Sequence, residues 1–201
     1  MPSRVAVFAS GGGTNLQALL DRFNQDHASP ARVELVVASR PAIGALERAV
    51  SAGIPSTVWA DMEPTLLLER LEADAIDLIV LAGWLRLVPA AVVHRYRERM
   101  INIHPALLPA FGGPAMYGRR VHEAVIAAGV RVSGATVHFV DDEYDSGRIL
   151  AQWPVPVLPG DTPAQLAARV LRAEHRILPA VVAALARGED PATASWLPEI
   201  T

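Results

Sequence analysis

Short apolar runs alternate along the first half of the chain with segments whose apolar residues recur at helical spacing. The runs are typical of strands buried on both faces of a sheet, and the spaced segments are typical of helices that cover it. The predicted strands are Val5–Ala9, Val33–Ala38, Ser56–Ala60, Leu78–Ala82 and Met100–Ile103, and the predicted helices are Leu16–Phe23, Ile43–Ala52, Glu63–Ala73 and Pro89–Arg97. This order predicts an α/β fold of Rossmann-like type, a mostly parallel twisted sheet with helices on both faces.

The second half of the chain predicts two adjacent strands between two helices. The predicted elements are a helix at Gly118–Ala128, strands at Gly134–Val140 and Ile149–Pro156, and a long last helix. Thr162 and Pro163 fit the N-cap and the first position of that helix, which is expected to reach Arg187 with or without a kink at Pro179. We expect an antiparallel strand in this C-terminal part. One domain is predicted over residues 1–187, followed by an irregular tail over 188–201.

The composition excludes several kinds of chemistry. The sequence has no cysteine, which excludes disulfides, thiolate catalysis and cysteine-bound metals, and no lysine, which excludes a Schiff base and a P-loop NTPase. The net charge is −3 and the arginines are scattered, so we expect no nucleic-acid binding. No apolar run approaches the ~20 residues of a membrane span, and the N-terminus lacks a signal peptide. We therefore expect a cytoplasmic protein that acts on small molecules.

Three loops lie at the ends of predicted strands, at Ser10–Asn15, Gly83–Val88 and Asn102–Pro109. Ligands of parallel sheets bind outside the carboxyl ends of the strands. We therefore expect these three loops to converge on one site.

The first loop has the form of a phosphate-binding loop. Its glycines let the backbone approach an anion, and the helix after it presents free N–H groups, with further donors on Thr14 and Asn15. Leu16 stands where a dinucleotide-binding loop needs a third glycine, so a phosphomonoester fits better than NAD. The alternative is a tight turn that only starts a helix.

Asn102 and His104 fall on the same face of the predicted strand Met100–Ile103 and its extension, because side chains alternate along a strand. An amide and an imidazole side by side form a donor pair that can stabilise a developing oxyanion. The alternative is a capped strand end with a buried, satisfied histidine.

An acidic turn, Asp141–Gly147, carries four carboxylates. One interpretation is a solvated loop. The functional interpretation selects Asp145, since a carboxylate facing His104 would raise the imidazole's pKa from ~6.5 and keep it protonated at neutral pH.

The remaining histidines carry weaker signals. His122 lacks the second histidine of a zinc-protease helix, because residue 126 is isoleucine. His27 and His94 are predicted to be exposed, His138 to be a satisfied structural residue, and His175 to cap or pack a helix.

Together the segments Ser10–Asn15, Leu81–Arg86, Asn102–Pro109, His138–Gly147 and Glu174-His175 resemble the phosphoribosylglycinamide formyltransferases, a family of folate-dependent enzymes. The resemblance runs in the family's order over residues 4–187. It implies the formyltransferase fold, with a phosphate-binding half at about 1–100 and a folate-binding and catalytic half at about 101–187. It also implies transfer of the formyl group of 10-formyltetrahydrofolate to the amine of glycinamide ribonucleotide, in de novo purine (IMP) biosynthesis, by a monomer or homodimer without a metal.

The resemblance assigns roles to particular residues. Asn102, His104 and Asp145 would be catalytic. Gly13, Thr14 and Asn15 would bind the substrate's phosphate, and Glu174 its ribose. The folate would contact Leu85, Arg86, Leu87, Val88, Asn102, Asp141, Asp142, Glu143, Tyr144 and Asp145.

Two features depart from the family's pattern, the loop Gly112–Gly118 and Leu171, which stands where some relatives have a polar residue near the nucleotide. Three alternatives stay open. One is a 10-formyltetrahydrofolate-dependent transferase that acts on methionyl-tRNA or a nucleotide sugar, and another is a formyltetrahydrofolate hydrolase. The third is a catalytically silent module that binds phosphate ligands.

Overall fold

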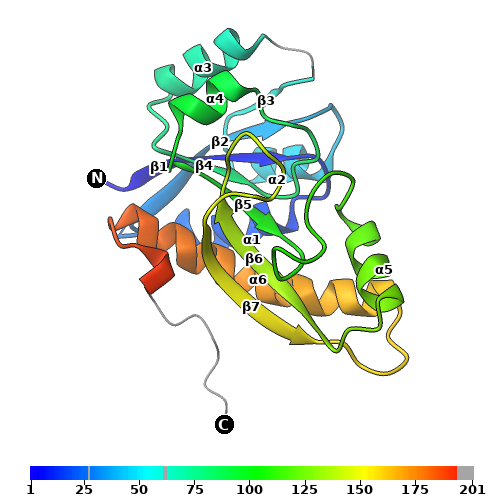
Figure 1. Ribbon diagram of the computed structural model, residues 1–201. Helices are drawn as coiled ribbons and strands as arrows, with labels where there is room; N and C mark the ends of the chain where they lie inside the picture. Colours follow the sequence, from blue (N-terminus) through cyan, green and yellow to red (C-terminus); the bar gives the residue numbers. More distant parts are fainter. Residues whose placement is uncertain (27, 61–62, 194–201) are drawn as a thin grey trace.

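The computed structural model describes residues 1–26, 28–60 and 63–193, and within them a seven-stranded sheet lies between two layers of helices (Figure 1). The elements are β1 (Ser3–Ala9), α1 (Thr14–Phe23), β2 (Ala31–Ala38), α2 (Gly44–Ser51), β3 (Ser56–Val58), α3 (Pro64–Ala73), β4 (Leu78–Leu81), α4 (Ala90–Arg95), β5 (Met100–His104), α5 (Arg119–Ala127), β6 (Val132–Phe139), β7 (Ile149–Pro156) and α6 (Pro163–Ala186).

The strand order is β3-β2-β1-β4-β5-β6-β7. The first five strands of the chain pair in parallel, whereas β6 is antiparallel to both β5 and β7. The predicted fold class is therefore confirmed, including the antiparallel part. The direction in which the parallel strands follow one another reverses between β1 and β4. At such a switch point the loops after the two strands diverge and leave room for a ligand.

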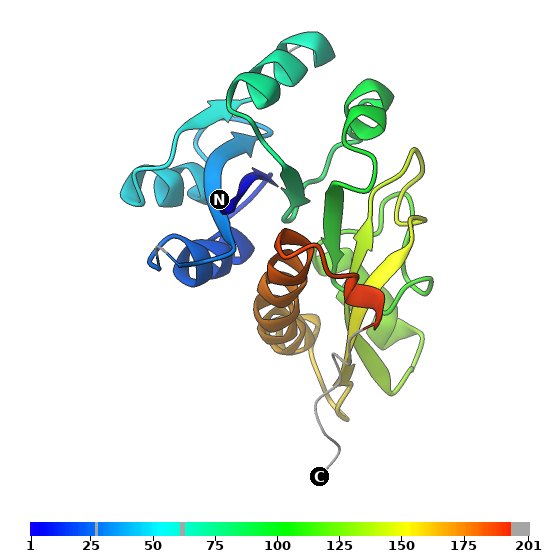
Figure 2. The same ribbon diagram turned by 90° about the vertical axis from the view of Figure 1, so that its left-hand side faces the viewer.

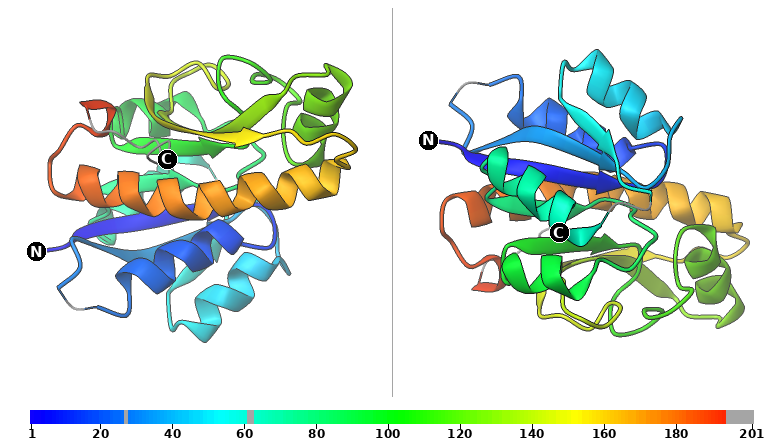
Figure 3. Two further views of the ribbon diagram at one scale, coloured as in Figure 1. Left: turned by 90° about the horizontal axis from the view of Figure 1, so that it is seen from below. Right: turned by 90° about the horizontal axis from the view of Figure 1, so that it is seen from above.

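Alternate side chains of each central strand feed two separate cores. In β1, Val5, Val7 and Ala9 pack with α1, α2, α5 and α6, whereas Ala6 and Phe8 pack with α3 and α4. This two-sided burial explains why the strands read as continuous apolar runs. Figure 3 shows α6 crossing one face of the sheet and α3 and α4 covering the other.

Helix α6 connects the two halves of the sheet. It starts with a capping box in which Thr162 and Gln165 satisfy each other's backbone N–H groups, and it continues through Pro179 for 24 residues. The helix lies between α1 on one side and the β6–β7 hairpin on the other (Figure 2). It therefore brings residues of the C-terminal half against the loop that follows β1.

The tail differs from its prediction. An irregular segment was expected after Gly188, but Pro191–Thr193 form a short 3₁₀ helix, labelled η1. The Asp190 side chain accepts the N–H of Ala192 at 3.1 Å and pairs with Arg148 of the hairpin, so a local turn and a tertiary ion pair order this segment. The prediction of an irregular tail is therefore wrong for these residues. Residues 194–201 and His27 lie outside the described residues. Among the described helices, none is long and apolar enough to cross a membrane.

Candidate active site

A cavity of about 610 Å³ opens at the carboxyl ends of β1, β4 and β5. Each of the three predicted loops contributes to its wall, through Ser10 and Gly11, through Gly83–Val88, and through Asn102–Pro105. The predicted convergence of the loops is confirmed. The other walls are the 113–119 loop, the acidic turn after β6, and the first half of α6.

Asn102 and His104 lie side by side on the last residues of β5. Both line the cavity, as their spacing along a strand predicts. Asn102 is opposite His138 of β6, and His104 is only 3% exposed. The strand therefore presents an amide and an imidazole from a rigid element.

The two ring nitrogens of His104 face different groups. Nε2 lies 2.8 Å from the carbonyl oxygen of Phe111, which can only accept, so this nitrogen carries a proton. Nδ1 lies 3.5 Å from Oδ2 of Asp145. A neutral His104 therefore has its lone pair on Nδ1, and protonation of the ring would place the new N–H toward Asp145.

The charge expected for His104 is not what the structure favours. Burial lowers the pKa of His104 below its usual range, and it outweighs Asp145 and the Phe111 carbonyl, which both raise it. The expectation of a protonated His104 in the free protein is wrong, because loss of water disfavours the cation more than one nearby carboxylate favours it. His104 is thus a neutral base at neutral pH with a counter-charge in place.

Asp145 is held as an anion beside His104 and Asn102. Burial alone would raise its pKa, but the nearby rings of His138 and His104 and the N–H of Gly113 together lower it. Its Oδ2 accepts that N–H at 2.9 Å, and its Oδ1 lies 3.4 Å from Nδ2 of Asn102. The backbone of Asp145 has a φ of 56°. Left-handed conformations of this kind are uncommon outside glycine and cluster at functional sites.

His138 belongs to the site, although it was predicted to be a satisfied structural residue. It is 2% exposed, and its Nδ1 lies 2.8 Å from its neighbour's carbonyl oxygen, that of Phe139. A neutral His138 therefore accepts from Asn102 through Nε2, at 3.0 Å. That bond uses one hydrogen of the Asn102 amide and fixes its orientation, so the other hydrogen is available near Asp145. Both ring nitrogens of His138 have hydrogen-bond partners, as predicted, but one of these bonds also orients Asn102. This role depends on the pairing of β6 with β5, which the sequence does not show.

His122 of α5 was also missed as a site residue. It is buried, it lines the cavity, and its Nδ1 has no hydrogen-bond partner among the described residues. Burial, with a smaller contribution from His104, lowers its pKa. A single histidine on a predicted helix does not indicate that its side chain lines a cavity.

The acidic turn is divided between the cavity and the outer surface. Asp141, Glu143 and Tyr144 line the cavity. Asp142 does not, because it turns outward and lies 2.9 Å from Nε2 of His94. The structure therefore brings together all the predicted folate-binding residues of this turn except Asp142.

The loop after β4 lines the cavity at all four predicted positions, Leu85, Arg86, Leu87 and Val88. Leu85 and Leu87 are large exposed apolar side chains beside the opening. Arg86 donates to the carbonyl oxygens of Trp59 and Ala60, so its guanidinium ties this loop to the segment after β3.

The glycine loop positions the start of α1. Gly13 has a φ of 72°, and a Cβ on it would lie 2.7 Å from Cα of Ala45 in α2, so only glycine fits there. Asn15 donates from Nδ2 to Oε2 of Glu174 on α6 at 2.6 Å, and its Oδ1 has no partner among the described residues. Burial raises the pKa of Glu174. Asn15 and Glu174 line the cavity, whereas Thr14 faces a second groove behind the loop.

Comparison with known proteins agrees with this geometry. The model of the formyl transferase family matches residues 3–182. The chain is 43% identical over 190 residues to the chloroplastic phosphoribosylglycinamide formyltransferase of Arabidopsis thaliana, covering 90% of this chain and 65% of that protein. It is 35% identical to the phosphoribosylglycinamide formyltransferase of Bacillus subtilis, covering 89% and 92%. The crystal structure of glycinamide ribonucleotide transformylase 1 from Symbiobacterium toebii superposes with a TM-score of 0.85 at 40% identity, covering 93% of this chain and 89% of that one.

Proposed function

Because the chain belongs to the formyl transferase family, we propose that it transfers the formyl group of 10-formyltetrahydrofolate to the amine of glycinamide ribonucleotide. The products are formylglycinamide ribonucleotide and tetrahydrofolate, in purine biosynthesis. The observation that carries the proposal is the meeting of Asn102, His104 and Asp145 at one end of a cavity, with the Asn15–Glu174 pair also in its wall. The family's relatives are named for the same reaction.

The site residues suit a formyl transfer. The substrate amine attacks the formyl carbon, and the carbonyl oxygen becomes an oxyanion that accepts from the Asn102 amide hydrogen, which in the free protein is directed at Asp145 at 3.4 Å. The amine must lose a proton, and neutral His104 takes it at Nδ1. The resulting imidazolium, whose new N–H faces Asp145, is stabilised by that ionised carboxylate. Collapse then forms the new amide, breaks the bond to N10 of the folate, and returns the proton from His104 to N10.

The nucleotide end of the cavity suits a sugar phosphate. Oδ1 of Asn15 is a buried acceptor that has no partner among the described residues, and Glu174 is a buried carboxyl group beside it, so both can accept from ribose hydroxyls. The glycine loop and the first N–H groups of α1 lie next to them and are suited to the phosphate. The resemblance places the phosphate at Gly13, Thr14 and Asn15.

The folate end suits a flat, partly apolar ring. We assign it to Leu85–Val88 and to the turn residues Asp141, Glu143 and Tyr144, which line one region of the cavity. The turn's carboxylates and backbone offer acceptors for a pterin's amino groups, and the leucines offer apolar contact. Asp142 is left out of this assignment, because it pairs with His94 on the outer surface.

The test is an assay of the purified protein with 10-formyltetrahydrofolate in three parallel reactions. One contains glycinamide ribonucleotide, one contains methionyl-tRNA, and one contains no acceptor. The expected result is tetrahydrofolate and formylglycinamide ribonucleotide in equal amounts with the first acceptor only. Release of formate without an acceptor would instead indicate a hydrolase, and no turnover with any acceptor would indicate a silent binding module.

The matched variant is His104→Ala, which removes the base and the imidazolium that faces Asp145. Loss of about 10²–10³-fold in kcat, with a circular dichroism spectrum and a melting temperature close to those of the unaltered protein, is the expected outcome. Near-normal turnover in this variant would contradict the mechanism.

A further inference from the structure

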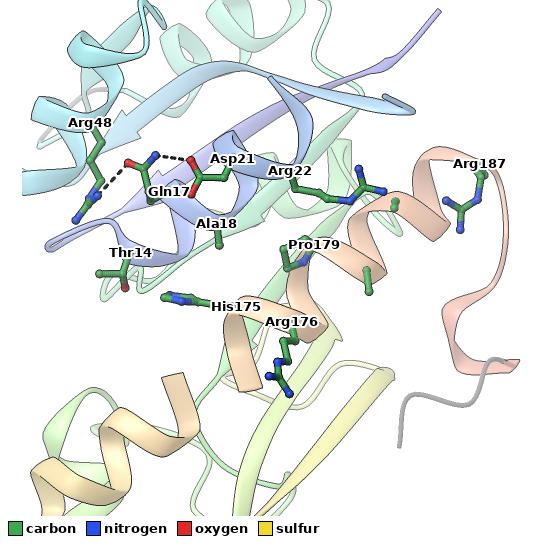
Figure 4. Close-up of a pocket in the computed structure, with 12 residues that line it drawn as sticks. Thr14, Gln17, Ala18, Asp21, Arg22, Arg48, His175, Arg176, Pro179 and Arg187 are labelled. Atoms are coloured by element: carbon green, nitrogen blue, oxygen red, sulfur yellow. Dashed lines mark hydrogen bonds between the residues drawn. The ribbon is translucent and has the colours of Figure 1, made fainter. Parts of the chain in front are cut away.

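A groove of about 850 Å³ lies between α1 and α6, behind the glycine loop and apart from the catalytic cavity (Figure 4). Its floor contains small residues of both helices. Its charged and polar lining consists of Thr14, Gln17, Asp21, Arg22, Arg48, His175, Arg176 and Arg187. Four arginines against one aspartate make this groove basic in a chain whose net charge is −3.

The groove and the catalytic cavity share one thin wall. Thr14 lines the groove and its neighbour Asn15 lines the cavity, whereas on α6 the corresponding neighbours are His175 and Glu174. The first turn of α1 therefore meets both spaces. An anion bound at that turn can be reached by groups from the groove as well as by groups from the cavity.

Arg48 is the groove arginine that contacts the glycine loop. Its Nε donates to the carbonyl oxygen of Gly12 at 2.8 Å, and its Nη1 donates to Oε1 of Gln17 at 2.9 Å. Within the described residues it forms no ion pair with a carboxylate. These two bonds leave Nη2 unused and hold the guanidinium at the same end of the groove as Thr14 and His175 (Figure 4).

His175 presents a second nitrogen at this end, which donates in the tautomer that carries hydrogen on Nε2. Its Nε2 is buried, and in the described part of the chain it has no hydrogen-bond partner. A buried ring nitrogen without a partner is costly, and a ligand that accepts from it removes that cost. The first backbone N–H groups of α1 also lack a side-chain acceptor, because the N-cap residue is Gly13.

We propose that Arg48 and His175 bind the phosphate of the nucleotide substrate from the groove side, together with the first backbone N–H groups of α1. The inference rests on the proposed function for the identity of the nucleotide. The sequence has no lysine, and Leu171, one turn before His175 on the cavity side, carries no charge. Arg48 then supplies the positive charge that the phosphate needs, in a position fixed by the Gly12 carbonyl and by Gln17.

Arg187 is not part of this site. Arg187 lies at the other end of the groove and is bound through Nε and Nη2 by both carboxylate oxygens of Glu189 at 2.7 Å (Figure 4). It therefore provides a matched control, since it lines the same groove and carries the same charge.

The first experiment measures binding of ribose 5-phosphate and of ribose by isothermal titration calorimetry. It compares the unaltered protein with Arg48→Met, His175→Phe and Arg187→Met. The expected result is that Arg48→Met weakens ribose 5-phosphate binding by about 10- to 100-fold, the range for one charge-assisted hydrogen bond. His175→Phe should weaken it by about 3- to 10-fold, and Arg187→Met should leave it unchanged. Arg48→Lys, which keeps the charge but not the fork of donors, should recover part of the loss.

The second experiment separates phosphate binding from a general disturbance of the loop. In the formyl-transfer assay, Arg48→Met should raise KM for glycinamide ribonucleotide by a similar factor and leave kcat and the KM for 10-formyltetrahydrofolate nearly unchanged. Equal binding of ribose 5-phosphate by Arg48→Met and the unaltered protein would overturn the proposal, and so would an equal loss in Arg187→Met. Absence of formyl transfer in the unaltered protein would refute the proposed function, while the calorimetry would still decide the anion site.

Discussion

Replacement of Asp145 by asparagine isolates the charge that faces His104. The side chain keeps its size, and its Oδ atom can still accept the N–H of Gly113, so the negative charge is the main change. The facing atoms are 3.5 Å apart, and the two side chains are 4% and 11% exposed, so solvent screens them little. At an effective dielectric constant of ~20, two unit charges at that distance attract by about 5 kcal/mol, an upper limit because each charge is spread over its group.

A loss of this size lowers the pKa of His104 by about 1–3 units from a value that burial has already lowered. NMR titration of the labelled imidazole measures it. In the formyl-transfer assay the acid limb of kcat/KM should move to lower pH by the same amount, and kcat should fall by about 10²–10⁴-fold, since the weaker base has no counter-charge. The control is Asp142→Asn, which removes an equal charge from the same turn but on the outer surface. A His104 titration that is the same in Asp145→Asn and the unaltered protein would refute the pairing.

Three further changes test the supporting structure. His138→Phe should lower kcat about 10-fold without altering the KM for the nucleotide, because Asn102 loses the acceptor that orients its amide; wild-type kcat would argue against that role. Gly13→Ala should reduce the free energy of unfolding by at least ~1–3 kcal/mol in urea titrations, since its φ is positive and its Cβ would clash, whereas Gly11→Ala, where nothing lies within 4 Å, should cost much less. The pKa of His122 is lowered in the folded state, so the unfolded chain binds this proton more readily, and protonation destabilises the fold as pH falls below the unfolded value of ~6.5. His122→Phe should therefore make the free energy of unfolding depend less steeply on pH below about 6.5, as measured by urea titrations at several pH values.

The sequence predicts the sheet well, because a strand that is buried on both faces needs apolar residues at nearly every position. Leu78–Ala82 has no polar member and Val33–Ala38 has only Glu34, and each coincides with an inner strand of the sheet to within two residues. Element ends are less well predicted. The helix expected over Pro89–Arg97 is shorter, Ala90–Arg95, since a local turn follows it in which Glu98 has a φ of 56° and the N–H of Arg99 donates to the Tyr96 carbonyl.

The convergence of the three loops was predictable from the sheet, but the charges within the site were not. The spacing of Asn102 and His104 predicts a shared face, and that prediction is confirmed. The protonation of His104 depends on how much water the folded protein excludes, which no local pattern records. The role of His138 depends on the register between β5 and β6, which is a long-range property.

The pairing of Asn15 with Glu174 spans 159 positions of the chain. The loop that begins the site leaves the ribosome well before the helix that completes it. Until α6 has emerged and packed against α1, the nascent chain has no wall to close the cavity beside Asn15. Translation that stops between α1 and α6 therefore yields a polypeptide without the Asn15–Glu174 pair, and under the proposed function such a fragment has no complete nucleotide site.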